Sequence, residues 1–395
     1  MNFFILTLIK VAVVAFVLLT TLAYLQWIER KVIAHVQLRV GPYRVGPHGL
    51  LQPLADVVKL ITKEGLIPSH VNRLFYLLAP FVAVALALTS IAVIPFGPQI
   101  TIGPVTTWMQ LTDLRIGILF VLAVSSIGVY GVALGGWASN NKYALLGGLR
   151  SSAQMISYEL PLAMAVAAPL LLANTLSFRD MVAYQSGYWL GFIPRWNLFP
   201  EILGFIVFII AGFAETNRVP FDLPEAENEL VAGFHTEYSS MNFAAFFMAE
   251  YANMVTVTAV ATLLFLGGWT PPFPEPYSDV IPILVFAIGG LTALYHGLNP
   301  ARRMDKFTLP ATALVFLGIA AIFAGSFFVP VLKTILMALF WFCGKILVLL
   351  FVFIWVRATL PRFRYDQLMR FAWTGLFPLS VINLLVTGLI VALAS

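Results

Sequence analysis

Ten apolar stretches, each close to the length that a helix needs to cross a bilayer, divide this chain from end to end. A helix spans the hydrocarbon core with about 20 residues. Hydrophobic residues make up 60% of the sequence and charged residues 10%, whereas soluble domains carry about 25% charged residues. The pattern predicts an all-α integral membrane protein: a polytopic helical bundle in a single membrane domain, residues 1–395. The predicted spans lie at about 3–27, 75–96, 114–137, 157–177, 201–214, 241–267, 281–298, 310–330, 335–359 and 371–393.

The basic residues divide unevenly between the two faces that these spans define. Most of the 23 Lys and Arg residues fall in the loops on the face reached after the first span. Loops rich in Lys and Arg stay in the cytoplasm. We therefore predict that both termini lie outside the cytoplasm and that the charged loops lie inside it. The other face holds Lys10, Arg115, Arg179, Arg195 and Lys333.

Several kinds of chemistry are excluded by the residue inventory. A single cysteine, Cys343, rules out a disulfide framework and a self-contained zinc or iron–sulfur site. The five histidines are scattered singly, and no nucleophile–base constellation or Gly-rich phosphate loop is present. We therefore expect no metal, flavin or iron–sulfur cluster to be bound by this chain.

The segment 214–240 concentrates acidic residues between two apolar spans. Within it, Asp222 can cap a short helix and then shares one helical face with Glu225 and Glu229. One interpretation is a surface for docking a basic partner. The other is a chain of acids that takes up protons when nearby charge changes, since crowded carboxylates disfavour joint ionisation. Its carboxylates are Glu215, Asp222, Glu225, Glu227, Glu229 and Glu237, against a single base, Arg218.

Two further acids fall inside predicted spans. Glu159 comes nine residues after Arg150, and Glu250 lies nine residues into the sixth span. A carboxylate in the membrane is costly unless it is paired, neutralised or hydrated. Glu159 is therefore either half of a structural pair with Arg150 or a proton-relay carboxyl, and Glu250 invites the same alternatives. Lys345, in the ninth span, is a weaker candidate because its long stem can reach the membrane surface.

The loop 29–74 contains a predicted amphipathic helix. Leu50, Leu54, Val57, Val58 and Ile61 form one apolar stripe, with polar residues opposite. The helix is too short and too charged to span, so it is expected to lie in the membrane surface. It is either a simple anchor or the floor of a chamber on the lipid side, beside Glu29 and Arg30.

The loop before the last span, WVRATLPRFRYDQLMR, groups four arginines around one acid. For Arg357 and Arg370 we favour a simple anchoring role on the cytoplasmic face. Arg362, Arg364 and Asp366 are expected to form a paired network that braces the cytoplasmic side.

Four long motifs resemble one known family. ERKVIAHVQLRVGPYRVGPHGLLQPLADVVKLITKE, GGLRSSAQMISYE, AETNRVPFDLPEAENELVAGFHTEYS and RATLPRFRYDQLM are similar, in order, to the ND1-type membrane subunits of bacterial NADH–quinone oxidoreductase, respiratory complex I. The resemblance implies a membrane subunit that helps form the quinone chamber, couples quinone reduction to proton pumping and carries no redox centre. It implies quinone as the substrate and peripheral quinone-binding, iron–sulfur and small membrane subunits as partners in the cell inner membrane.

The resemblance also implies roles for individual residues. Glu29, Arg30 and Asp56 would border the access path of the quinone, and Arg39 and Arg44 would face the peripheral subunits. The proton-coupling acids would be Glu159, Glu215, Asp222, Glu225, Glu227, Glu229 and Glu250.

One region departs from the family pattern. The family core has eight spans, and residues 275–330 look like an inserted helical hairpin that preserves the orientation of the later spans. We expect this hairpin at the periphery, facing lipid or an accessory subunit. Two other functions stay open: the anchor subunit of a hydrogenase or of a dehydrogenase with another donor, and a stand-alone proton-coupled transporter.

Overall fold

Helices account for most of the chain in a computed structural model, which describes residues 3–102, 105–222, 232–300 and 305–394. Within these ranges nine helical runs are long and apolar enough to cross a membrane. The prediction of a polytopic helical bundle is confirmed. The nine runs are α1 (Phe3–Val36), α3 (Arg73–Ile91), α4 (Gly117–Ala138), α5 (Lys142–Ala173), α9 (Ser240–Phe265), α10 (Tyr277–Leu298), α11 (Asp305–Ser326), α12 (Pro330–Thr359) and a last run made of α13 (Tyr365–Arg370), the π-helical turn η3 (Phe371–Leu376) and α14 (Phe377–Ala394).

The remaining predicted span is the short helix α7 (Ile202–Glu215). Its 14 residues reach about 21 Å, less than the hydrocarbon thickness. The helix does not continue towards Val219, because the backbone leaves the helical conformation at Thr216 and Asn217 has a positive φ of 50°. The chain after α7 therefore starts at a level inside the bundle, and Arg218 is buried there.

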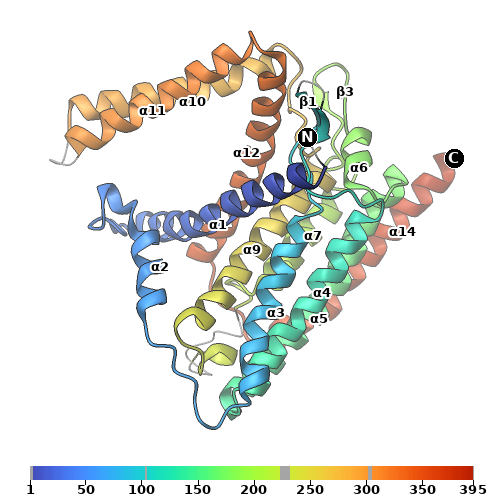
Figure 1. The fold of residues 1–395 in the computed structure, drawn as a ribbon. Helices are drawn as coiled ribbons and strands as arrows, with labels where there is room; N and C mark the ends of the chain where they lie inside the picture. The colour runs from blue at the N-terminus through green and yellow to red at the C-terminus, as the bar shows by residue number, and fades with distance from the viewer. Residues whose placement is uncertain (1–2, 103–104, 223–231, 301–304, 395) are drawn as a thin grey trace.

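The core lies where α3, α4, α5, α7, α9 and α14 pack side by side (Figure 1). Small residues let these helices approach closely. A Cβ on Gly131 of α4 would meet Ala83 of α3 at 3.1 Å, and one on Gly136 would meet the backbone of Gly148 in α5. The helix α9 is the most buried span, so it forms the centre of the bundle.

Short elements cover the two ends of the bundle. At the end that carries the N-terminus (Figure 1), the structure has the antiparallel pair β1 (Gln99–Ile102) and β2 (Val105–Trp108), the helix α6 (Phe178–Tyr184), and the pair β3 (Tyr188–Trp189) and β4 (Ile193–Pro194). Other short elements are η1 (Pro47–Gly49), the amphipathic helix α2 (Gln52–Thr62) and η2 (Gly233–His235). The predicted apolar stripe of α2 is exposed, as a surface-lying helix requires.

The helices α10 and α11 form a hairpin within the range 275–330. They pack tightly on each other, since a Cβ on Gly290 would meet Leu317 at 2.7 Å and one on Gly297 would meet Pro310 at 2.7 Å. Figure 1 shows the pair extending away from the rest of the bundle, and few of its side chains are buried.

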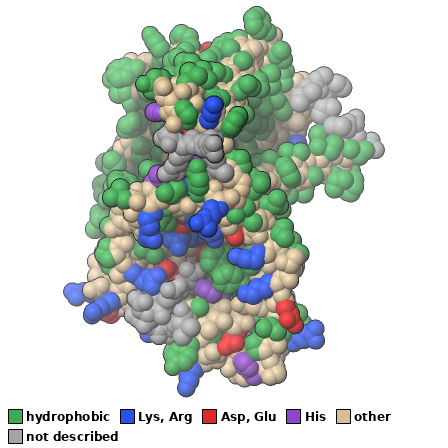
Figure 2. Space-filling model, turned by 90° about the vertical axis from the view of Figure 1, so that its left-hand side faces the viewer, with side chains coloured by type: hydrophobic (Ala, Val, Ile, Leu, Met, Phe, Trp, Pro, Cys, Tyr) green, Lys and Arg blue, Asp and Glu red, His purple; other side chains and the backbone are tan. Residues whose placement is uncertain are grey.

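Basic side chains gather on one face of the molecule. Figure 2 shows Lys and Arg across the middle and lower part of that face, below a largely apolar upper part. This clustering matches the uneven distribution of basic residues in the sequence.

Candidate functional site: a buried charge cluster beside two cavities

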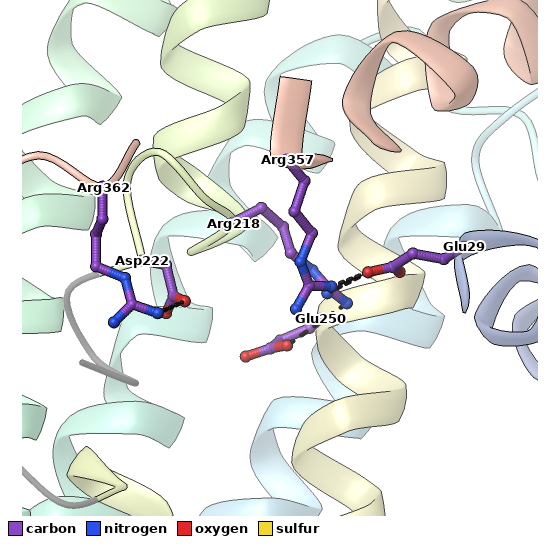
Figure 3. A network of polar contacts seen from close by, with 6 residues as sticks. All are labelled: Glu29, Arg218, Asp222, Glu250, Arg357 and Arg362. Carbon is purple, nitrogen blue, oxygen red and sulfur yellow. Dashed lines mark hydrogen bonds and ion pairs between the residues drawn. The ribbon is translucent and has the colours of Figure 1, made fainter. Parts of the chain in front are cut away.

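Four charged side chains from four helical regions meet inside the bundle. Glu29 lies near the end of α1, Arg218 just after α7, Glu250 on α9 and Arg357 in the last turn of α12. Figure 3 shows Arg218 and Arg357 pointing towards Glu29, with Glu250 beneath Arg218. We call these four residues the charge cluster. No two of them are close in the sequence, so only the packing of the helices brings them together.

Arg218 is the centre of the charge cluster. Its Nη1 lies 3.4 Å from Glu29 Oε1, and its Nη2 lies 3.8 Å from Glu250 Oε2. The guanidinium also lies 4.3 Å from the ring centre of Tyr251, which adds a cation–π contact. Arg218 and Glu29 are 5% and 4% exposed, and breaking a pair at such burial costs about 3–5 kcal/mol. Glu29 and Glu250 therefore share one cation.

Arg357 forms a second ion pair with Glu29. The assignment of Arg357 to simple anchoring is thus wrong, because its side chain turns inward to a buried acid instead of outward to the membrane surface. Glu29 Oε2 is buried, and no hydrogen-bond donor reaches it from the parts of the chain that the structure describes. This oxygen is available to a water or a polar group of a bound molecule.

A separate pair lies beside the charge cluster. Arg362 Nη2 lies 2.8 Å from Asp222 Oδ2 (Figure 3). Nearby, Phe363 N donates to Pro220 O at 3.1 Å. These contacts join the acidic segment to the loop before the last span. The expected network of Arg362 with Arg364 and Asp366 takes another form: Arg362 bonds Asp222, while Arg364 caps α13 and Asp366 is exposed in its first turn.

The first loop is fastened to α1 by a further ion pair. Arg30 Nη1 lies 2.9 Å from Asp56 Oδ2 on α2, and Asp56 Oδ1 accepts from Gln52 at 3.1 Å. Lys59 lies 3.5 Å from the same carboxylate. The predicted pair of access residues, Arg30 and Asp56, is therefore in direct contact next to Glu29. Arg39 and Arg44 are exposed on the loop between α1 and α2.

Two adjoining cavities lie between α3, α4, α5, α7 and α9. The first, about 30 Å³, is lined by both Glu250 and Glu215. The second, also about 30 Å³, shares Glu215 and runs between Leu162, Phe208 and Val260. Each can hold about one or two water molecules, since both have polar walls. The polar groups common to both are Ser90, Ser125, Glu215 and Asn253.

Glu159 belongs to the same region. Its carboxyl accepts a hydrogen bond from Ser126 of α4, next to Ser125, which lines both cavities together with Glu215. Arg150, the partner expected under the structural alternative, instead lies 5.9 Å from the ring centre of Tyr365. Glu215 and Glu250 thus line the first cavity, and Glu159 lies beside it through its contact with Ser126. Glu225, Glu227 and Glu229 lie outside the described residues.

Sequence reasoning missed several residues of this site. In the sequence, Arg218 differs from its surroundings only as the single base among six acids. That is the one feature that could have predicted a buried ion pair for it. Tyr251, Ser90, Ser125 and Asn253 give no signal, because Ser, Asn and Tyr are ordinary in membrane helices. Over the described ranges, no group of three His, Cys, Asp or Glu side chains is close enough to hold a metal ion.

Comparisons with known proteins place these features in a family. The sequence profile of the NADH dehydrogenase family matches residues 9–388. An NADH-quinone oxidoreductase H-type subunit of Solibacter usitatus is 66% identical over 99% of this chain and 98% of its own length. The corresponding subunit of Koribacter versatilis is 49% identical over 99% of this chain and 98% of its own length. That of Geobacter metallireducens is 45% identical over 100% of this chain and 97% of its own length. The chain therefore belongs to the NADH dehydrogenase family, as an H-type membrane subunit of NADH–quinone oxidoreductase.

Proposed function

We propose that this chain couples quinone reduction to proton movement through the charge cluster and its two cavities. The observation that carries the proposal is the position of Arg218 between Glu29 and Glu250. Glu29 borders the side from which the quinone headgroup would approach, next to Arg30 and Asp56. Glu250 lines the cavity that also holds Glu215. One guanidinium therefore connects the quinone side to the proton side.

The magnitude of this coupling is sufficient for the task. Two unit charges 3.8 Å apart interact by about 4 kcal/mol at an effective dielectric constant near 20. A change of charge near Glu29, as when a quinone gains electrons and protons, would draw Arg218 towards one acid at the expense of the other. An energy of this size decides whether Glu250 holds a proton, because 1.4 kcal/mol is about a factor of ten in proton binding.

Protons would then pass from Glu250 through the water-sized cavities to Glu215 and Glu159. Ser126 hydrogen-bonds Glu159, and Ser125 and Asn253 line both cavities with Glu215. Such groups can relay protons between carboxyls through ordered water. The acids Asp222, Glu225, Glu227 and Glu229 would supply this path from the cytoplasmic side, with Asp222 fixed by Arg362.

Neighbouring subunits and the membrane would complete the path. The quinone would bind at a site shared with peripheral quinone-binding and iron–sulfur subunits, for which the exposed Arg39 and Arg44 would form a docking surface. Small membrane subunits would continue the path from Glu159. The chain would lie in the bacterial inner membrane with both termini on the periplasmic side, and the hairpin 275–330 would face lipid or an accessory subunit.

Glu250→Gln tests the proposal in membrane vesicles that carry the complete enzyme. Gln keeps the shape of the side chain but cannot take up and release a proton by titration. We expect NADH–quinone turnover and proton uptake to fall by at least about tenfold, a loss of about 1.4 kcal/mol or more. Reduction of ferricyanide by NADH measures the peripheral electron-transfer arm, and it should not change.

The matched control is Glu64→Gln, which removes an exposed acid in the loop after α2. It should leave both activities unaltered. Normal pumping and turnover in Glu250→Gln would refute the coupling role and favour a purely structural pair with Arg218.

A further inference from the structure

The end of the α10–α11 hairpin contacts the loop between α1 and α2. His48 Nε2 lies 2.8 Å from Thr308 Oγ1 and 3.3 Å from Asp305 Oδ1, both in the first turn of α11. Asp305 is largely buried, with 13% of its side chain exposed. We call His48, Asp305 and Thr308 the clasp. His48 and Thr308 lie 260 positions apart in the sequence.

The loop is folded so that His48 is presented to the hairpin. His48 has a positive φ of 52°, and the flanking Gly46 and Gly49 have φ values of 71° and 79°. A Cβ on Gly49 would lie 2.5 Å from Pro42 O, so the loop closes tightly on itself. The His48 ring meets Tyr43 edge-on at 5.4 Å. A non-Gly residue at positive φ costs about 1–2 kcal/mol, so the surrounding contacts must hold this conformation.

A continuous series of contacts leads from the clasp to the charge cluster. The chain continues from His48 into α2, which begins at Gln52. Gln52 donates to Asp56, and Asp56 pairs with Arg30 at 2.9 Å. Arg30 directly follows Glu29, which pairs with Arg218. A displacement of the clasp would therefore move α2 and the groups beside Glu29.

The hairpin is otherwise fastened mainly at its opposite end. There Lys333 Nζ donates to Asp279 Oδ2 at 2.6 Å, joining the start of α12 to the first turn of α10. Between the two ends, apolar residues such as Leu284, Ile288 and Leu291 are exposed. Among the residues that the structure describes, the clasp thus joins the far end of the hairpin to the first loop.

We infer that the clasp positions α2 and the Arg30–Asp56 pair for quinone binding, and that the hairpin acts as a brace for the first loop. This inference rests on the proposed function, because it assigns the quinone approach to the Glu29 side. His48, Asp305 and Thr308 are positioning residues: none of them touches the reacting atoms. A long isoprenoid tail should need this alignment more than a short-tailed quinone, because its headgroup must be threaded past α2.

The test compares KM and kcat for long-tailed and short-tailed quinones in membranes with the complete enzyme, normalised to NADH–ferricyanide activity. His48→Asn breaks the clasp cleanly, since Asn tolerates positive φ but is too short to reach Thr308. Asp305→Ala removes the other side. We expect each to raise KM for the long-tailed quinone about threefold to tenfold, the range for losing one buried polar contact. The kcat should stay within about twofold.

Two further variants show whether the contact itself matters. His48→Gln keeps a donor for Thr308 and should restore most of the KM. Asp279→Asn weakens the opposite attachment of the same hairpin and should leave KM unchanged. An unchanged KM in both clasp variants would overturn the inference, and so would an equal rise of KM in Asp279→Asn, since the hairpin's general attachment would then explain the effect.

Glu250→Gln in the same assay separates this inference from the proposed function. If Glu250→Gln lowers turnover while the clasp variants keep a normal KM, the inference about the hairpin is refuted and the proposed function stands. If Glu250→Gln turns over quinone normally, the coupling role of the charge cluster fails whatever the clasp variants do.

Discussion

Two basic residues inside the bundle have opposite kinds of partner: the buried Arg218 and the half-buried Lys345. Arg218 lies between two carboxylates next to a cavity. Lys345 Nζ donates to three backbone carbonyls, those of Leu266 at 2.6 Å, Gly268 at 2.8 Å and Thr270 at 2.6 Å. It also lies 4.4 Å from the ring centre of Trp196. Burial of a charge is therefore not enough to indicate function, because the type of partner decides what the charge does.

The physical difference lies in whether the partners titrate. Carbonyls after the end of α9 keep their charge distribution at every pH, and a cation at a helix C-terminus is stabilised by the unpaired carbonyls and the helix dipole. Lys345 thus closes the end of α9 and does not need to change state. The carboxylates around Arg218 are titratable groups, so under the proposed function the same kind of contact would couple charge to protonation.

Arg218→Lys should produce the largest effect on activity. Lys keeps the charge, but it lacks the planar fork that reaches two acids at once. We expect NADH–quinone turnover to fall by about tenfold or more, with the assembled enzyme still present because Arg357 continues to neutralise Glu29. Turnover per assembled enzyme is the measurement, and near-normal turnover would show that a point charge suffices and that the shared fork is dispensable.

Lys345→Met should sharpen the comparison from the other side. The variant leaves three carbonyls without a donor, at a cost of about 1–3 kcal/mol for each buried group that stays unsatisfied. We expect the amount of assembled enzyme in membranes, measured on native gels, to drop several-fold. Turnover per assembled enzyme should stay within about twofold. A specific loss of proton pumping at normal assembly would contradict the structural role of Lys345.

His235 offers a third case, in which the partners are aromatic rings. It lies outside the membrane spans against Phe234, Phe243 and Phe247, and burial lowers its pKa from 6.5 to about 4. Below pH 6.5 the unfolded chain binds this proton and the folded chain does not. The free energy of unfolding is therefore unaffected by His235 above pH 6.5. It decreases as the pH falls from 6.5 towards 4, by about 3 kcal/mol in all.

The contribution of His235 to the pH dependence of stability is the smallest of the three effects at neutral pH, because the imidazole is uncharged in both the folded and the unfolded chain. His235→Phe should therefore flatten the fall in melting temperature of the solubilised enzyme between pH 6.5 and 4.5 and leave turnover at pH 7.5 unaltered. An identical pH profile in the variant and the parent would show that His235 finds a stabilising partner when protonated.

The apolar pattern predicted most of the fold, and the acids of the site could be recognised one by one. The predicted spans correspond to nine long helical runs and the short α7 within the described ranges. The sequence identifies Glu159, Glu215 and Glu250, because a carboxylate in an apolar stretch is costly unless it is paired, neutralised or hydrated. The pairing of Glu29 with Arg357 could not be predicted, since their 328-residue separation leaves no local pattern. The clasp between His48 and Asp305 escapes sequence reasoning on the same physical grounds.

The sequence by itself determined that the chain is a membrane bundle, which face carries most of its basic residues and which acids are costly to bury. Those properties depend on composition and on the period of a helix, and both are local. Only the tertiary structure decided that Arg218 stands between Glu29 and Glu250, that Arg357 turns inward and that Lys345 closes a helix. Such contacts depend on how each helix is rotated and how deeply it sits against its neighbours, and these are set by close packing of side chains across the whole bundle.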